Sequence, residues 1–437
     1  MNLVLKFPHQ KVRGIYLQLI LVLVMFWLRD VLNFPSSITY LTDVLLIFLL
    51  VKEYKSIFSN IKNSNSKVQV TIFSLILINM FLGAIINLVN PMLFLWGMRN
   101  NLRFYLFFFL CIGVLRKKDV YIFVKILKKF YWINFFLCLY QYFIQGLSND
   151  YLGGIFGISQ GCNAYINVFL CIIMSVILGE YFSKKITTFK FLLYIITNIL
   201  VATLCELKIF YIEFIIMFIL LILKTKISFK SILICSLGVL GTGVGIFFML
   251  KYNPEIFNIF LNKNSLNYYL AGNGYTNSGD LNRFTAIQEI YKQFFKGNIK
   301  LSLFGFGLGS CEHSSFKFLE SDFYIKYGYL NYRWMTHAWV YLEQGIVGIL
   351  LLLLFFVKIF KFNIDKKRII PTYMYIATLV YIPICILGLI YNCALQIEVT
   401  YLIAFMCSIP YILVKERNLE VKFVKRNNKK ISLQRKI

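Results

Sequence analysis

Apolar runs, each about as long as a bilayer-crossing helix, recur from near the N-terminus almost to the C-terminus of this 437-residue chain. A transmembrane helix must cover a hydrocarbon core of roughly 30 Å, which takes about 20 mostly apolar residues. Only 15% of the residues are charged, whereas soluble globular proteins contain about 25%. The runs therefore predict a polytopic integral membrane protein and exclude an ordinary soluble domain.

The hydropathy pattern predicts an all-α fold of about 12 transmembrane helices, which form a single membrane domain over residues 1–437. A large external loop with short helices is expected at 251–335, between the ninth and tenth spans, and a basic cytoplasmic tail at 416–437. The predicted spans are 14–32, 36–51, 68–89, 102–115, 130–146, 163–182, 191–206, 209–223, 231–250, 337–357, 372–391 and 398–414.

The positions of the basic residues predict how these helices are oriented. The chain carries 46 Lys and Arg against 19 Asp and Glu, which gives a net charge of +27. With the N-terminus in the cytoplasm, 33 of the 46 basic residues fall in cytoplasmic segments, as the positive-inside rule requires. Both termini are therefore expected in the cytoplasm. We expect the basic tail to contact anionic membrane lipid and not nucleic acid.

The external loop is predicted to contain an amphipathic helix over Asp280–Lys296. Asp280 is a suitable N-cap, apolar residues follow at intervals of three and four, and Gly297 can end the helix. Arg283 would lie in its first turn. The glycine series Phe304-Gly-Phe-Gly-Leu-Gly309 has no surrounding βαβ unit and no following Lys-Ser/Thr, so it predicts a flexible turn and not a nucleotide-binding loop.

Three ionisable residues lie where the chain returns to the membrane. Arg333 and His337 stand at the expected water boundary, and Glu343 follows inside the tenth span. An ionisable residue within a span is a functional candidate by default. The structural alternatives stay open: a single His at a helix start is often structural, and Glu343 could pair with a basic residue of a neighbouring helix.

A group of basic side chains is expected to converge at the external mouth of the bundle. Its members are Arg99, Arg103, Lys208, Arg283, Arg333 and His337. Guanidinium groups bind phosphate oxygens in a bidentate manner, so the group predicts a phosphate or pyrophosphate site that a lipid-linked ligand could enter sideways from the bilayer. The alternative is that Arg283 is a solvated surface charge and that Lys208 marks the water boundary.

Four sequence elements carry a resemblance to a known family. They are Gly97-Met-Arg-Asn-Asn-Leu-Arg103, Gly153-Gly-Ile-Phe-Gly157, Arg283 with Phe304-Gly-Phe-Gly-Leu-Gly309, and Thr336-His337 with Glu343-Gln-Gly-Ile-Val-Gly348. Together with the hydropathy plan, they resemble the bacterial O-antigen polymerase and O-antigen ligase superfamily. Three positions depart from the family pattern: Ala338 follows the His, the interval from His337 to Gly345 is short, and Lys208 stands where Arg is common.

The resemblance implies an inverting, metal-independent glycosyl transfer on the outer face of the bacterial cytoplasmic membrane, without a cofactor. The donor would be a glycan on undecaprenyl pyrophosphate, and the acceptor a second lipid-linked repeat unit. A base must take the proton of the acceptor hydroxyl, and positive groups must stabilise the departing pyrophosphate. No Asp-x-Asp element and no CxxC spacing is present, so the sequence gives no support for a metal site.

On this resemblance, His337 is expected to act as the base or as an orienting group, with Glu343 orienting the His. Arg283 and Lys208 would hold the pyrophosphate, and Arg99, Arg103 and Arg333 are further candidates for that role.

The expected function is that of a capsule or O-antigen repeat-unit polymerase, with a chain-length regulator and a flippase as possible partners. The alternatives are an O-antigen-type ligase of the same superfamily, a lipid-linked oligosaccharide flippase and a membrane-bound O-acyltransferase.

Overall fold

The computed structural model describes residues 10–224, 241, 243, 247, 274–276 and 279–434. The described part is helical, apart from one isolated β-bridge between Tyr275 and Leu281. The long helices are α1 (Gln10–Val31), α2 (Tyr40–Asn63), α3 (Lys67–Ile86), α4 (Pro91–Val114), α5 (Lys117–Phe143), α6 (Asn163–Phe182), α7 (Thr188–Leu204), α8 (Lys208–Lys224), α15 (Thr336–Asp365), α16 (Thr372–Tyr391) and α17 (Thr400–Gln434). Every predicted span coincides with one of them except 231–250, which lies almost entirely outside the described residues.

The all-helical class is confirmed, and the apolar helices make this a membrane protein. Among the described residues, 5 helices are long and apolar enough to cross a membrane: Val12–Val31, Lys67–Ile86, Asn163–Phe182, Thr336–Asp365 and Thr372–Tyr391. The predicted number of spans is not confirmed, because helices such as α4 and α5 carry several charged side chains along their length.

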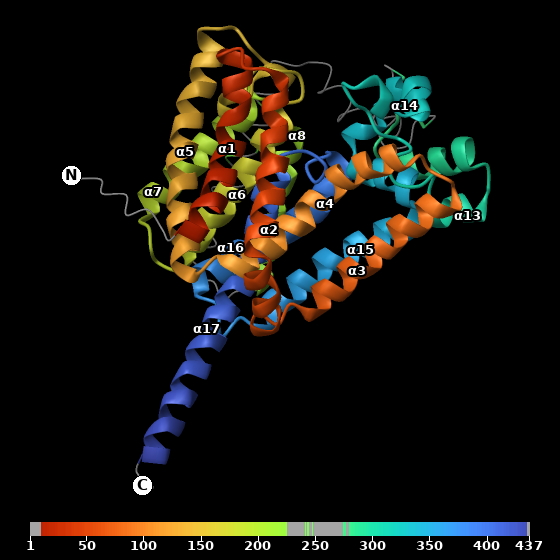
Figure 1. Cartoon of the computed structure of the whole chain (residues 1–437). Coiled ribbons are helices and arrows are strands. Elements are labelled where there is room, and N and C mark those ends of the chain that lie inside the picture. The colour runs from red at the N-terminus through yellow and green to blue at the C-terminus, as the bar shows by residue number, and fades with distance from the viewer. Residues whose placement is uncertain are drawn as a thin grey trace.

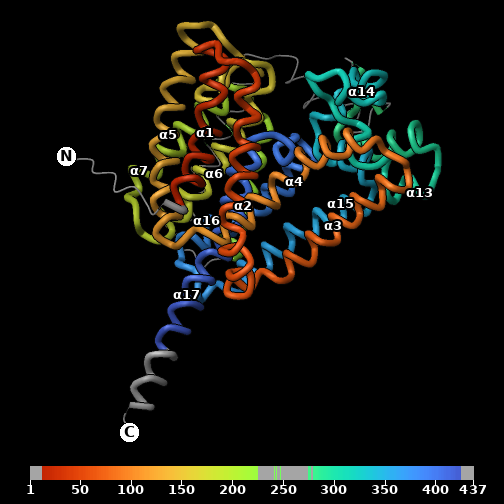
Figure 2. The backbone as a smooth tube through the Cα atoms, in the orientation of Figure 1, coloured from red at the N-terminus to blue at the C-terminus, as the bar shows by residue number. Residues whose placement is uncertain are grey.

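The core lies where α17 passes through the bundle. Its residues from Val399 to Val414 are almost entirely buried, and it packs mainly on α4, while α16 packs on α6 and α15. Past the bundle, α17 continues as an isolated helix to Gln434 (Figures 1 and 2). The predicted tail at 416–437 is therefore a helical extension of the last span as far as Gln434.

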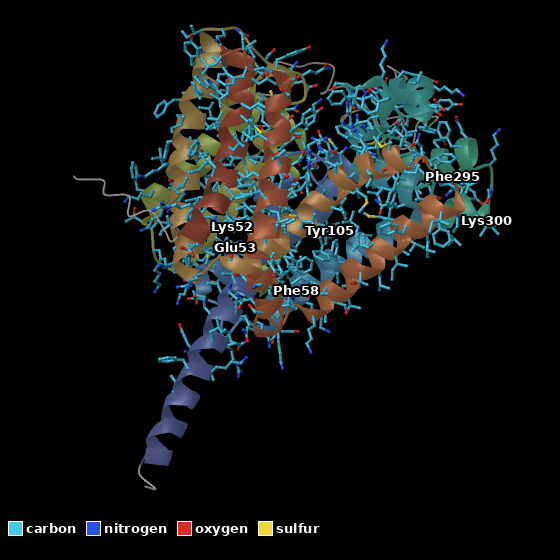
Figure 3. The ribbon with its side chains drawn as sticks, viewed as in Figure 1. Lys52, Glu53, Phe58, Tyr105, Phe295 and Lys300 are labelled. Carbon is cyan, nitrogen blue, oxygen red and sulfur yellow. The ribbon has the colours of Figure 1, made fainter. Side chains whose placement is uncertain are left out.

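The two ends of the bundle differ in charge. The C-terminal ends of α2, α4, α6 and α15 lie at the end from which α17 projects (Figure 1). Basic residues gather there, in the runs 116–118, 184–185 and 366–368 and at Lys62 and Lys67 on either side of the α2–α3 turn. Lys52, Glu53 and Phe58 belong to the half of α2 that leads to this end (Figure 3). The described part of the long loop lies at the opposite end, over the tips of α3, α4 and α15 (Figure 1).

Helix α4 begins earlier than the hydropathy pattern predicted. The predicted span started at residue 102, but the helix starts at Pro91, and the Asn90 side chain accepts a hydrogen bond from the Met92 backbone N at 2.9 Å. Pro at the first helical position and Asn at the N-cap are both favourable. Arg99 and Arg103 therefore lie within the helix and not before it. The boundary was wrong because a charged side chain with an internal partner need not end a span.

The predicted amphipathic helix Asp280–Lys296 is wrong in its first half. Regular helix begins only with α12 (Ala286–Glu289) and continues as the π-helical segment η4 (Ile290–Phe295). The Asp280 carboxylate does not cap a helix, because its Oδ1 accepts from the Asn331 amide at 2.7 Å. Arg283 consequently lies in the turn before the helix. The predicted end at Gly297 is confirmed by the left-handed backbone of Lys296, with φ 49°.

The glycine series after α13 (Ile299–Phe304) is packed tightly between helices, where the sequence predicted a flexible turn. Gly305, Gly307 and Gly309 have φ values of 67°, 90° and 91°, a region that glycine alone adopts without strain. A Cβ on Gly309 would lie 2.1 Å from the backbone O of Leu93. The series is therefore wedged against α4, and its backbone approaches neighbouring helices.

Candidate functional site

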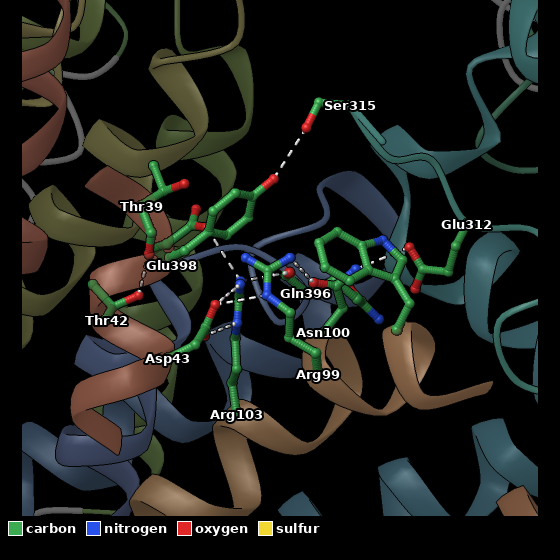
Figure 4. A network of polar contacts seen from close by, with 12 residues as sticks. Thr39, Thr42, Asp43, Arg99, Asn100, Arg103, Glu312, Ser315, Gln396 and Glu398 are labelled. Atoms are coloured by element: carbon green, nitrogen blue, oxygen red, sulfur yellow. Dashed lines mark hydrogen bonds and ion pairs between the residues drawn. The ribbon is translucent and has the colours of Figure 1, made fainter. Parts of the chain in front are cut away.

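Two of the predicted phosphate ligands are bound by a single carboxylate, that of Asp43. Asp43 of α2 accepts hydrogen bonds from Nε of Arg99 at 2.7 Å and from Nε and Nη2 of Arg103 at 2.7 and 2.8 Å (Figure 4). The Tyr401 hydroxyl donates to the same carboxylate at 3.0 Å. Arg103 has a second ion pair with Glu398 at 3.3 Å and is only 2% exposed.

The Arg99 guanidinium has two aromatic neighbours in addition to Asp43. Its Cζ lies 4.6 Å from the ring centre of Tyr40 and 4.5 Å from that of Trp96. Both arginines are thus neutralised by carboxylates or covered by rings, so the geometry gives them a structural role. Asp43, an acidic residue in an otherwise apolar span, was the sequence feature that could have indicated these ion pairs, because a charge inside a span usually pairs with another charge.

Arg333 also has an internal carboxylate. Its Nη2 lies 3.7 Å from Oε2 of Glu312, to which the Asn100 amide donates at 2.9 Å. The guanidinium stacks on Trp339, with its Cζ 4.3 Å from the ring centre. Glu312 is fully buried, and burial raises the pKa of its carboxyl to about 7 although Arg333 opposes the shift. Arg333 is therefore positioned by the Trp339 ring and by Glu312.

The raised pKa of Glu312 predicts how stability depends on pH. The folded protein keeps a proton on Glu312 that the unfolded chain releases at a lower pH, so stability should fall as pH rises from about 4.5, the ordinary pKa of a Glu carboxyl, through about 7. Thermal unfolding of the detergent-solubilised protein across this range measures the slope. Glu312→Gln, which stays neutral, should flatten it, whereas Glu420→Gln on the exposed part of α17 should not. An unchanged slope in Glu312→Gln would refute this assignment.

Glu343 holds the glycine series and does not contact His337. Its Oε1 accepts hydrogen bonds from the backbone N of Gly309 and of Cys311, each at 3.1 Å, and the side chain is 1% exposed. A carboxylate that accepts two backbone N–H groups fixes the conformation of the turn. The expected role of Glu343 in orienting the His is therefore not seen in this geometry.

Both ring nitrogens of His337 face backbone carbonyl oxygens. Nδ1 lies 3.1 Å from O of Leu389 at the end of α16, and Nε2 lies 2.9 Å from O of Arg283. A neutral imidazole donates through one nitrogen only, and neither nitrogen here is turned toward open space. His337 therefore ties the backbone of Arg283 to the end of α16, and in this conformation it offers no lone pair to a substrate.

Arg283 differs from the other three arginines in its partners. Its Nε donates to the backbone O of Tyr391 at 3.2 Å, and its Cζ lies 4.9 Å from the ring centre of that residue. Within the part of the chain that the structure describes, no carboxylate comes within ion-pair distance of its guanidinium. Lys208, the first residue of α8, interacts electrostatically with Arg283 and with Glu206. Arg283 and Lys208 are thus within electrostatic range of each other, but Lys208 does not line the cavity on which Arg283 lies.

A cavity of about 270 Å³ lies beside Arg283. Its wall comes from the segment between α5 and α6, the α7–α8 turn, the start of α6 and the end of α16. Besides Arg283, it presents two aromatic rings, two carboxylates and several amides: Trp334, Tyr391, Asp150, Glu206, Asn163 and Asn167. Aromatic faces pack on the C–H faces of sugars, while carboxylates and amides accept and donate hydrogen bonds to hydroxyl groups. The cavity is therefore chemically suited to a glycan with an anionic group next to it.

The arginine cluster, which consists of Arg99, Arg103, Asp43 and Glu398, supports one side of this cavity. Arg103 Nη1 lies within 3.5 Å of the backbone O of Gln396, and the Thr336 hydroxyl donates to the Gln396 side chain at 2.8 Å. The preceding residues Asn392 and Cys393 line the cavity. Arg103 thus acts on the site through the loop between α16 and α17.

The sequence did not identify Asp150, Asn163 or Asn167 as site residues, and it left Glu206 as a possible boundary charge. The available signal was weak. It consisted of Asp150 and Glu206, two acidic residues that each lie beside a turn at the predicted external end of the bundle. No protein-family model and no curated protein sequence matches the chain.

Proposed function

We propose that the protein is a polysaccharide repeat-unit polymerase that acts on the outer face of the bacterial cytoplasmic membrane. It transfers a glycan from undecaprenyl pyrophosphate to a second lipid-linked repeat unit. The observation that carries this proposal is the cavity beside Arg283, where a cation without a described carboxylate partner adjoins aromatic, amide and carboxylate groups. A glycosyl pyrophosphate presents a sugar next to an anion, and the cavity offers a partner for each.

Arg283 and Lys208 hold the departing pyrophosphate in this proposal. Preorganised positive groups stabilise negative charge that develops on a leaving group, and Arg does so with two parallel hydrogen bonds. Arg99 and Arg103 do not take this role, because Asp43 and Glu398 already neutralise them. Arg333 does not take it because its guanidinium is stacked on Trp339 beside Glu312.

The charge distribution supports the proposed topology of about 12 spans with both termini in the cytoplasm. Basic turns gather at the end from which α17 projects, and the cavity lies at the other end. In the proposed topology, the cavity lies on the side where a lipid-linked repeat unit is exposed after translocation. A flippase and a chain-length regulator are the partners that such a reaction requires or uses.

A reconstituted assay tests the function directly. The purified protein in liposomes should convert a synthetic undecaprenyl-pyrophosphate repeat unit into a ladder of longer lipid-linked glycans. Movement of the substrate across the bilayer without chain growth would instead identify a flippase. Transfer only to a different acceptor, such as a lipid A core saccharide, would identify a ligase. Substrate that remains unchanged in both respects would overturn the proposal.

A further inference from the structure

Two carboxylates line the cavity beside Arg283, and they differ in how they are held. The Asp150 carboxylate accepts a hydrogen bond from the Asn163 side chain, and its backbone O accepts from Gly161 N at 3.1 Å. Asp150 is therefore bound into the wall. Glu206 comes from the other side, at the tip of the α7–α8 turn.

The backbone of Glu206 is held in a conformation that side chains rarely adopt. Its φ is 50°, in the left-handed region, and hydrogen bonds on either side fix the turn: Glu206 N to Thr203 O at 3.2 Å and Leu207 N to Ala202 O at 2.9 Å. Lys184 ends α6 with the same left-handed backbone and the same pair of hydrogen bonds, so this is a common form of helix end. Its consequence here is that the turn holds the Glu206 backbone in a fixed position on the cavity wall.

The surroundings of Glu206 favour proton uptake. Partial burial raises the pKa of its carboxyl, the nearby Asp150 raises it further, and Lys208 opposes both effects. A carboxylate with a raised pKa is a stronger base at neutral pH. The Asn149 side chain also lies against this carboxylate: with the amide nitrogen turned toward Glu206, it donates to Oε2 at 3.0 Å and to Oε1.

We propose that Glu206, and not His337, is the general base of the glycosyl transfer. This inference rests on the proposed function and deepens it. The acceptor hydroxyl attacks the anomeric carbon of the donor and gives its proton to the Glu206 carboxylate. The new glycosidic C–O bond forms as the bond from the anomeric carbon to the pyrophosphate oxygen breaks. The pyrophosphate leaves with the bonding electron pair and is held by Arg283 and Lys208.

His337 is a positioning residue in this scheme. Its two ring nitrogens are used by the carbonyl oxygens of Leu389 and Arg283, and it does not line the cavity. Its replacement would loosen the backbone that carries the Arg283 guanidinium.

The test compares variants of the full-length protein in the liposome assay, with a synthetic undecaprenyl-pyrophosphate repeat unit as substrate. Glu206→Gln should lower kcat by about 10²–10⁴-fold with little change in KM, and the acidic limb of its kcat–pH profile should disappear. Glu206→Asp should keep part of the rate and keep an acidic limb. His337→Gln should lower kcat, because it loosens the backbone that carries Arg283, and should leave that limb in place. Glu320→Gln, in the described part of the long loop, serves as the control with unchanged rates.

The outcomes separate this inference from the proposed function. A wild-type protein without chain growth would overturn both. If the wild-type protein is active, two results would overturn the assignment of Glu206 alone. One is a fully active Glu206→Gln variant. The other is a kcat–pH profile whose acidic limb is lost only in His337→Gln or only in Asp150→Asn. Thermal unfolding of each variant, together with the partial activity of Glu206→Asp, distinguishes a lost base from a misfolded protein.

Discussion

Arg283→Ala should abolish the synthesis of long chains while single repeat units continue to be made. Arg283 is the arginine of the predicted group with no carboxylate partner in the described residues, and it lies on the cavity wall. Loss of one group that stabilises developing negative charge typically lowers kcat by about 10²–10³-fold. Chain-length analysis in cells and initial rates in the liposome assay both measure the effect.

Matched variants make this prediction specific. Arg283→Lys keeps the charge but loses the bidentate geometry, so it should retain a fraction of the rate. Lys292→Ala removes an exposed positive charge from the neighbouring segment η4 and should leave the rate unchanged. Wild-type chain length in Arg283→Ala would show that the pyrophosphate is held elsewhere.

The helical class and most helix positions followed from hydropathy, because burial in lipid requires long apolar helices whatever their tertiary packing. Helix ends were less predictable where a paired charge extends a helix, as in α4. The prediction of a helix from Asp280 was wrong for a related reason. Asp280 has the residue type of an N-cap, but its carboxylate accepts a hydrogen bond from Asn331, 51 positions along the chain. Local patterns contain no information on such distant partners.

The candidate site was predictable in part. Arg283 and His337 were grouped from their expected side of the membrane and from the family resemblance, and they lie in contact through the Arg283 carbonyl at 2.9 Å. The chemistry of the contact was not predictable, because it depends on which atoms of a folded turn point at the imidazole. Arg99, Arg103 and Arg333 were grouped only by their expected side of the membrane. This grouping did not include Asp43 and Glu312, whose carboxylates approach these arginines only in the folded bundle.

Asp43→Ala is expected to be the most destabilising single change in the arginine cluster. Removing one member of a buried ion pair costs about 3–5 kcal/mol, because the remaining charge stays in a low-dielectric environment. Arg103 is 2% exposed, and its second pair with Glu398, at 3.3 Å, leaves part of its charge compensated. We therefore expect a loss near the lower end of that range, measured by reversible unfolding in mixed detergent micelles.

Glu420→Ala provides the contrast, because its ion pair with Arg417 is exposed and such pairs contribute about 0–1 kcal/mol. The double variant Asp43→Ala with Arg103→Met should recover part of the stability lost in Asp43→Ala. The buried charge of Arg103 is then removed, but Arg99 loses Asp43 and Glu398 loses Arg103 as ion-pair partners. A substrate-binding role for Arg103 predicts the opposite pattern: unchanged unfolding in Asp43→Ala and tighter binding of an anionic substrate. The two patterns cannot occur together, so one unfolding series decides whether Arg103 supports the fold or binds the substrate.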